Sequence, residues 1–138
     1  MTRSDTIHAI LTTCRTIAVV GLSPKPWRES FGVSRAMQAA GYRIIPVNPA
    51  AGTDTILGEK VYGSLTEAAR HETIDLVNIF RNSADVPPVV DEAMACGLPA
   101  IWMQQGIAHA DAARKAEAAG LRVVQDACIA VEQRRLGR

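Results

Sequence analysis

Short apolar runs and amphipathic stretches alternate along the whole chain. The first run, residues 17–20, is rich in β-branched side chains and ends at Gly21, which is typical of a strand buried on both faces. Four further runs of the same character predict strands at residues 42–47, 74–80, 98–103 and 121–124. Three of them directly follow a glycine, the residue that most often ends a helix.

Helical periodicity fills the intervals between these runs. Apolar positions three or four apart predict helices over residues 5–14, 30–40, 65–71, 84–96, 108–119 and 127–136, with Asp5 capping the first. A short extra strand is expected at residues 60–62. Strands that alternate with helices give a parallel sheet covered on both sides. The sequence therefore predicts one α/β domain over residues 1–138: a Rossmann-like, doubly wound parallel sheet of about five strands in three αβα layers.

Small, amide and cationic side chains gather where the predicted strands end. Ligands of doubly wound sheets bind in the crevice outside these carboxyl ends. The first strand leads through a small-residue turn into a helix, and the unpaired N–H groups near such a helix start favour a phosphate. The strand ends carry Gly21, Leu22, Ser23, Pro24 and Lys25; Asn48 and Pro49; Phe80, Arg81 and Asn82; and Gln104, Gln105 and Gly106, while Arg28 adds charge to the first turn.

The first turn differs from the fingerprint of nicotinamide dinucleotides. That fingerprint needs G-x-G-x-x-G and an acid at the end of the second strand, whereas this turn has one glycine, Gly21, and the second strand ends at Asn48. An amide at that place can bind a ribose or an adenine without repelling a phosphate. The pattern favours NADP or coenzyme A (CoA) over NAD. A side chain at Gly21 is expected to block the approach of the backbone to the ligand.

Composition and charge exclude several classes of protein. With 48% hydrophobic and 21% charged residues, the chain has the composition of an ordinary globular protein. A net charge of +1 gives no basic field for nucleic acid. No apolar segment has the length of a membrane span or a signal peptide. Three widely spaced cysteines indicate reduced thiols and a cytoplasmic protein.

No catalytic or metal-binding set is visible in the sequence. His8, His71 and His109 share no metal-ligand spacing. Ser23 does not lie in a G-x-S-x-G nucleophile elbow. We therefore predict no metal site and no catalytic residue.

Seven motifs in register resemble one protein family. They are VGLSPKPWRES, GYRIIPVNP, LGEKVYGSL, IDLVNIFR, AIWMQQGI, AEAAGLRVV and a terminal Cys128-x-x-x-Glu132. From Thr16 to Leu136 they resemble the small stand-alone CoA-binding proteins, which are similar to the N-terminal domain of the succinyl-CoA synthetase α subunit. The resemblance implies a Rossmann-like domain that holds CoA or an acyl-CoA across its strand ends, and it adds Met103 to the candidate binding residues.

The resemblance also has departures. The synthetase carries a CoA-contacting lysine after its second strand, where this chain has Ala50 and Ala51. We therefore expect Lys25, Arg28 or Arg81 to supply the positive charge that contacts CoA. The synthetase phosphohistidine lies in a second domain that the matched motifs do not include, which implies binding without catalysis by this chain alone. Two alternatives stay open: an NADP-dependent oxidoreductase fragment, and the CoA-binding partner subunit of a split acyl-CoA ligase. Either a homo-oligomer or a separate catalytic chain is compatible with the sequence.

Overall fold

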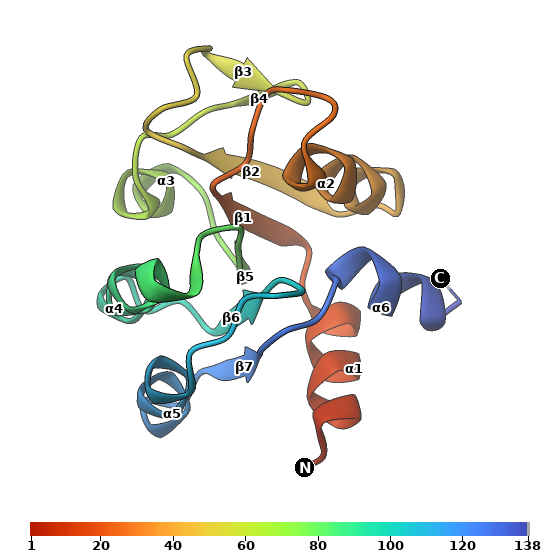
Figure 1. Ribbon diagram of the computed structural model, residues 1–138, viewed down its shortest axis with the longest axis vertical. Coiled ribbons are helices and arrows are strands. Elements are labelled where there is room, and N and C mark those ends of the chain that lie inside the picture. Colours follow the sequence, from red (N-terminus) through yellow and green to blue (C-terminus); the bar gives the residue numbers. More distant parts are fainter. Residues whose placement is uncertain (138) are drawn as a thin grey trace.

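The computed structural model describes residues 1–137 and contains a five-stranded parallel sheet. The spatial order is β2-β1-β5-β6-β7, so the chain winds outward from β1 in both directions (Figure 1). The order reverses between β1 and β5, where a doubly wound sheet forms its ligand crevice. The strands are β1 (Thr16–Val20), β2 (Arg43–Val47), β5 (Leu76–Ile79), β6 (Ala100–Met103) and β7 (Arg122–Val124).

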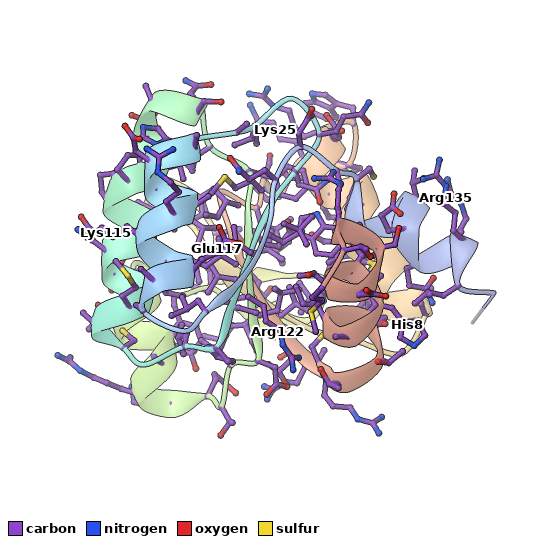
Figure 2. The ribbon with its side chains drawn as sticks, turned by 90° about the horizontal axis from the view of Figure 1, so that it is seen from below. His8, Lys25, Lys115, Glu117, Arg122 and Arg135 are labelled. Carbon is purple, nitrogen blue, oxygen red and sulfur yellow. The ribbon has the colours of Figure 1, made fainter. Side chains whose placement is uncertain are left out.

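Helices cover both faces of this sheet, which confirms the predicted three-layer α/β fold (Figure 1). On one face lie α1 (Arg3–Thr13), α2 (Glu29–Ala39) and α6 (Ile129–Arg135), and on the other α3 (Leu65–His71), α4 (Val86–Ala95) and α5 (Ala110–Ala118). Figure 2 shows the two outer layers from below, with His8 on α1 and Lys115 on α5 marking opposite sides of the molecule.

Each central strand buries side chains on both of its faces. On β1, Ala18 packs in the layer of α3, α4 and α5, whereas Ile17 and Val19 pack in the layer of α1, α2 and α6. All four residues of β5 and of β6 are buried, which explains why these segments read as uninterrupted apolar runs. Trp102 is buried as a core residue, as predicted, and its Nε1–H donates to the Ala127 carbonyl at 2.8 Å.

Two local expectations are wrong in detail. Thr2, not Asp5, caps α1: the Thr2 hydroxyl accepts the Asp5 N–H while the Asp5 carboxylate accepts the Thr2 N–H, which forms a capping box. The predicted strand at residues 60–62 is instead an antiparallel hairpin of β3 (Thr55–Ile56) and β4 (Glu59–Lys60), with Tyr62 bridging to Val47. Within residues 1–137 no helix is long and apolar enough to cross a membrane.

Candidate functional site

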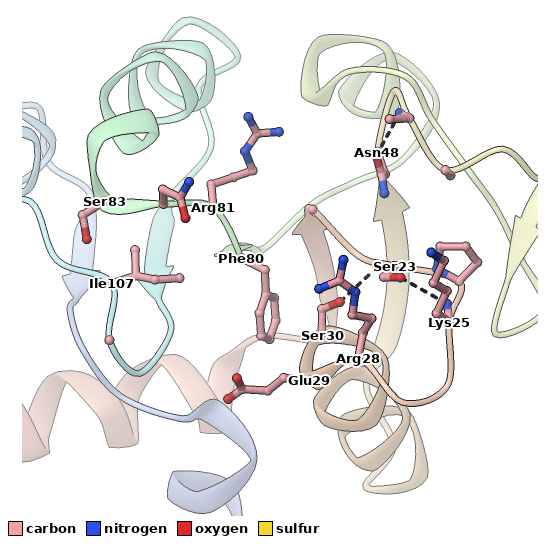
Figure 3. Close-up of a pocket in the computed structure, with 16 residues that line it drawn as sticks. Ser23, Lys25, Arg28, Glu29, Ser30, Asn48, Phe80, Arg81, Ser83 and Ile107 are labelled. Carbon is pink, nitrogen blue, oxygen red and sulfur yellow. Dashed lines mark hydrogen bonds between the residues drawn. The ribbon is translucent and has the colours of Figure 1, made fainter.

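A cleft of about 660 Å³ opens at the carboxyl ends of β1, β2 and β5 (Figure 3). Its position is the reversal of strand order, where ligands of doubly wound sheets bind. Its volume lies in the range of small-molecule sites. Ten of the residues named from the sequence line it: Gly21, Ser23, Pro24, Lys25, Arg28, Asn48, Phe80, Arg81, Asn82 and Gly106.

Five other candidates lie outside the lining of this cleft. Leu22 and Met103 are fully buried in the core, and Gln104 is only 1% exposed. Pro49 is exposed next to Asn48, and Gln105 lines a second pocket of about 430 Å³ between the starts of α1 and α6. Their contacts with a ligand stay predictions.

Six lining residues were not among the binding candidates: Glu29, Ser30, Ala50, Ala51, Ser83 and Ile107. Glu29 and Ser30 form the first turn of α2, and they line the cleft because the N-terminus of a helix that follows a strand points at the ligand crevice. The sequence contained a signal for Glu29 and Ser30, since the turn after the first strand predicts a helix that begins near residue 30.

Gly21 is required by the protein's own backbone. Its φ is +92°, and a Cβ atom at this position would lie 2.4 Å from the Phe80 carbonyl oxygen. The Gly21 N–H donates to the Val47 carbonyl at 2.9 Å, so the residue joins the ends of β1 and β2 while it passes close to the end of β5. A side chain here therefore meets the Phe80 carbonyl oxygen. That it would also block the approach of the ligand stays a prediction.

Two serines fold the turn after β1 onto the start of α2. The Ser30 hydroxyl accepts the Ser23 N–H at 3.0 Å, and the Ser23 hydroxyl accepts the Lys25 N–H at 3.1 Å (Figure 3). These two backbone donors are thus already paired. The N-cap of α2, Arg28, makes no capping hydrogen bond with its side chain. The Phe31 N–H donates to the Arg28 carbonyl, so the Glu29 and Ser30 N–H groups are the first-turn donors left to an anion.

Three cationic side chains line the same cleft as this helix start. Lys25 and Arg28 belong to the turn after β1, and Arg81 belongs to the loop after β5 (Figure 3). The Lys25 ammonium lies 5.9 Å from the ring centre of Trp27, and an Arg81 nitrogen lies 3.8 Å from an Asp85 carboxylate oxygen. The Arg81 and Asp85 side chains are both about half exposed, and such pairs are weak. Arg81 can therefore exchange Asp85 for a phosphate at little energetic cost.

Asn48 connects two of the loops that line the cleft. Its Nδ2 donates to the Leu22 carbonyl at 2.9 Å, and its Oδ1 accepts the Ala50 N–H at 2.9 Å. The first bond reaches the turn after β1, and the second shapes the loop after β2. This side chain therefore holds the two loops at a fixed separation.

Replacing Asn48 with alanine is expected to lower the free energy of unfolding by about 2 kcal/mol, since two hydrogen bonds of about 1 kcal/mol each are lost. Asn48→Asp keeps the acceptor for Ala50 but sets a carboxylate against the Leu22 carbonyl, so it should be no less damaging. Urea denaturation of the three proteins tests this. Unchanged stability in Asn48→Ala would show that the two loops do not depend on the side chain.

The cysteines are free thiols, in agreement with the prediction of no disulfide framework among them. Burial, assisted by the nearby Asp75 carboxylate, raises the pKa of Cys14 to about 12, so this thiol stays protonated at neutral pH. Cys128 is partly buried beside the start of α6. None of the three lines the cleft.

Known proteins resemble this chain in sequence and in fold. The family model described as CoA binding domain matches residues 15–134. The protein YneT of Bacillus subtilis (strain 168) is 45% identical over 125 residues, which cover 91% of this chain and 90% of YneT. The solved structure of a hypothetical protein from Pyrococcus horikoshii OT3 is 33% identical, with a TM-score of 0.89, over 100% of this chain and 94% of that one.

A larger synthetase contains the same fold. The dinucleotide forming acetyl-coenzyme A synthetase 1 of Ca. Korarchaeum cryptofilum matches with a TM-score of 0.67 at 23% identity, over 79% of this chain and 25% of its own. This level of identity shows a shared fold. The family model, in contrast, covers most of the sequence, and YneT matches nearly end to end. The chain belongs to the CoA binding domain family.

Proposed function

We propose that this chain binds CoA or an acyl-CoA in the cleft at the ends of β1, β2 and β5, as one CoA-binding domain. One observation carries the proposal: the cleft brings the uncapped start of α2 together with Lys25, Arg28 and Arg81. Helix N-termini and clustered cations both favour phosphate groups. Membership of the CoA binding domain family supports CoA as the phosphorylated ligand.

The phosphate groups of CoA match the two kinds of anion-binding group in the cleft, the start of α2 and the cationic side chains. CoA carries a diphosphate and a separate 3′-phosphate, so it needs two anion-binding groups. The first-turn N–H groups of α2 can receive one phosphate without a charged side chain. The cationic side chains can then neutralise the other through charge-assisted hydrogen bonds.

A preference for CoA over both nicotinamide dinucleotides is the expected result of calorimetric titration. NADP should bind more weakly than CoA, and NAD more weakly still, because the end of β2 carries Asn48 in place of the acid that would hold the ribose hydroxyls of NAD. Tighter binding of NAD than of CoA would overturn the proposal. Mass spectrometry of the ligand released from the purified protein would then identify the bound compound directly.

The proposal assigns binding, and no chemistry, to this chain alone. It rests on the lining of the cleft, in which the hydroxyls of Ser23, Ser30 and Ser83 each accept a backbone N–H and none is hydrogen-bonded to a general base. Incubation with succinate, ATP and CoA should give no acyl-CoA. Turnover that survives repurification would contradict this assignment.

A second candidate function is that of a CoA-binding partner subunit. The observation that favours it is the occurrence of the same fold as a quarter of a larger acetyl-CoA synthetase chain. In that case a separate catalytic chain would complete the site. Tagged protein isolated at low salt should then carry a larger ligase-like chain in fixed proportion, whereas a free-standing binder would be isolated without one.

A further inference from the structure

Three buried polar atoms behind the cleft lack a hydrogen-bond partner. They are the Ser34 hydroxyl oxygen, the Asn78 Oδ1 and the Gln104 Nε2. The three residues are at most 2% exposed. Buried polar groups are nearly always paired, because an unpaired one loses its hydration without compensation. Within residues 1–137 no other buried side-chain nitrogen or oxygen lacks a partner, so these three atoms call for an explanation.

Asn78 and Gln104 point to the same face of the sheet. Asn78 lies on β5 opposite Trp102 of β6, and Trp102 packs in the layer of α1, α2 and α6. Gln104 follows Trp102 by two residues and so lies on the same face. Its Oε1 accepts the Ile129 N–H at the start of α6 at 3.1 Å. Both side chains therefore lie between the sheet and the helices that cover this face.

Ser34 and Asn78 continue the wall of the cleft inward. Ser30 lines the cleft and lies one helical turn before Ser34 on the buried face of α2. Phe80 also lines the cleft, two residues beyond Asn78 on the same face. Figure 3 shows the Phe80 ring extending toward Glu29, at the side of the cleft formed by α2. The ring thus lines the cleft and packs against the buried layer behind it.

We propose that Ser34, Asn78 and Gln104 form an inner polar site, which opens when the Phe80 ring turns aside and then holds an uncharged amide of the ligand. An amide presents an N–H donor and a carbonyl acceptor together. The inner polar site offers the matching acceptor on Asn78, the matching donor on Gln104 and a hydroxyl that serves as either.

Charge decides which part of the ligand fits here. Every buried polar residue in the described part of the chain is uncharged, so a phosphate or carboxylate in this layer would lack a counter-charge. The pantetheine part of CoA, called the arm below, contains two amide groups and carries no charge. The inference rests on the proposed function and deepens it: the nucleotide occupies the outer cleft, and the arm reaches the inner polar site.

The test compares CoA with 3′-phosphoadenosine 5′-diphosphate, which keeps the phosphates and lacks the arm. Ser34→Ala and Asn78→Val each remove one unpaired polar atom. Calorimetry should show each variant binding CoA about three- to tenfold more weakly, the effect of one hydrogen bond. Affinity for the armless nucleotide should stay within twofold of the parent. The melting temperature should be unchanged or raised, because an unpaired buried group has been removed.

The controls separate the two proposals. Thr6→Ala, which removes a hydroxyl from α1 at a distance from the cleft, should leave both affinities unchanged. If the parent binds neither nucleotide, the proposed function fails, and the inner polar site fails with it. If the parent binds both but Ser34→Ala and Asn78→Val weaken neither, or weaken both equally, the arm does not enter the inner polar site and only this inference is overturned.

Trp102 gives an independent readout. It is fully buried beside Asn78, and the other tryptophan, Trp27, is 77% exposed. In a Trp27→Phe background the fluorescence comes from Trp102 alone. Its emission should change on addition of CoA and stay constant with the armless nucleotide. An equal response to both ligands would contradict insertion of the arm.

Discussion

Replacing Gly21 with alanine is expected to lower the free energy of unfolding by about 2–5 kcal/mol. The left-handed backbone costs a side chain about 1–2 kcal/mol, and overpacking adds about 1–3 kcal/mol. The second cost arises because the new Cβ would lie 2.4 Å from the Phe80 carbonyl oxygen and 3.4 Å from the Arg81 Cδ. Urea denaturation measures the loss, and Gly21→Val should be worse.

Gly32 supplies the matched control for this prediction. It lies inside α2, and a Cβ added there would meet no atom within 4 Å. Gly32→Ala should raise stability by about 1 kcal/mol, the difference in helix propensity between the two residues. If Gly21→Ala were as stable as Gly32→Ala, the close approach of β1 to the end of β5 would be wrong.

Removing a cation from the cleft is expected to weaken CoA binding by roughly tenfold or somewhat more, with the fold intact. Lys25→Ala and Arg81→Ala each delete one charge-assisted hydrogen bond to a phosphate, worth about 1.5–3 kcal/mol. The loss should be smaller with dephospho-CoA for whichever residue faces the 3′-phosphate. Raising the salt concentration should reduce both effects.

Arg122→Ala is the control for the charge change itself. Arg122 begins β7, and Figure 2 shows it at the opposite end of the molecule from Lys25. The variant should bind CoA like the parent. If Lys25→Ala and Arg81→Ala also bind like the parent, the ligand does not lie across these strand ends and the proposed site is wrong.

The sequence predicted the fold well because its signals are local. The apolar runs, the helical periodicity and the glycines at helix ends each depend on neighbouring residues, and together they require a parallel sheet covered on both faces. The same signals located the cleft, since parallel strands bring their carboxyl ends to one edge. Lys25, Arg28 and Arg81 were selected in this way, and all three line the cleft.

Side-chain direction at the strand ends required the tertiary structure. Leu22 and Met103 follow or end strands as predicted, yet they point into the core. Asn48 lines the cleft as predicted, and the structure adds that its amide bonds to the Leu22 carbonyl and the Ala50 N–H. In each case a neighbour supplied by folding determines where the side chain lies.

The sequence by itself therefore determined the layers, the parallel sheet and the place of the cleft, because hydrophobic periodicity encodes which faces are buried. Only the tertiary structure decided why position 21 must be glycine and which polar atoms remain unpaired behind the cleft. Both depend on how distant segments pack: the Phe80 carbonyl lies beside Gly21, and Ser34, Asn78 and Gln104 are buried without partners for one polar atom each. Such contacts are set by packing in three dimensions, which no local pattern records.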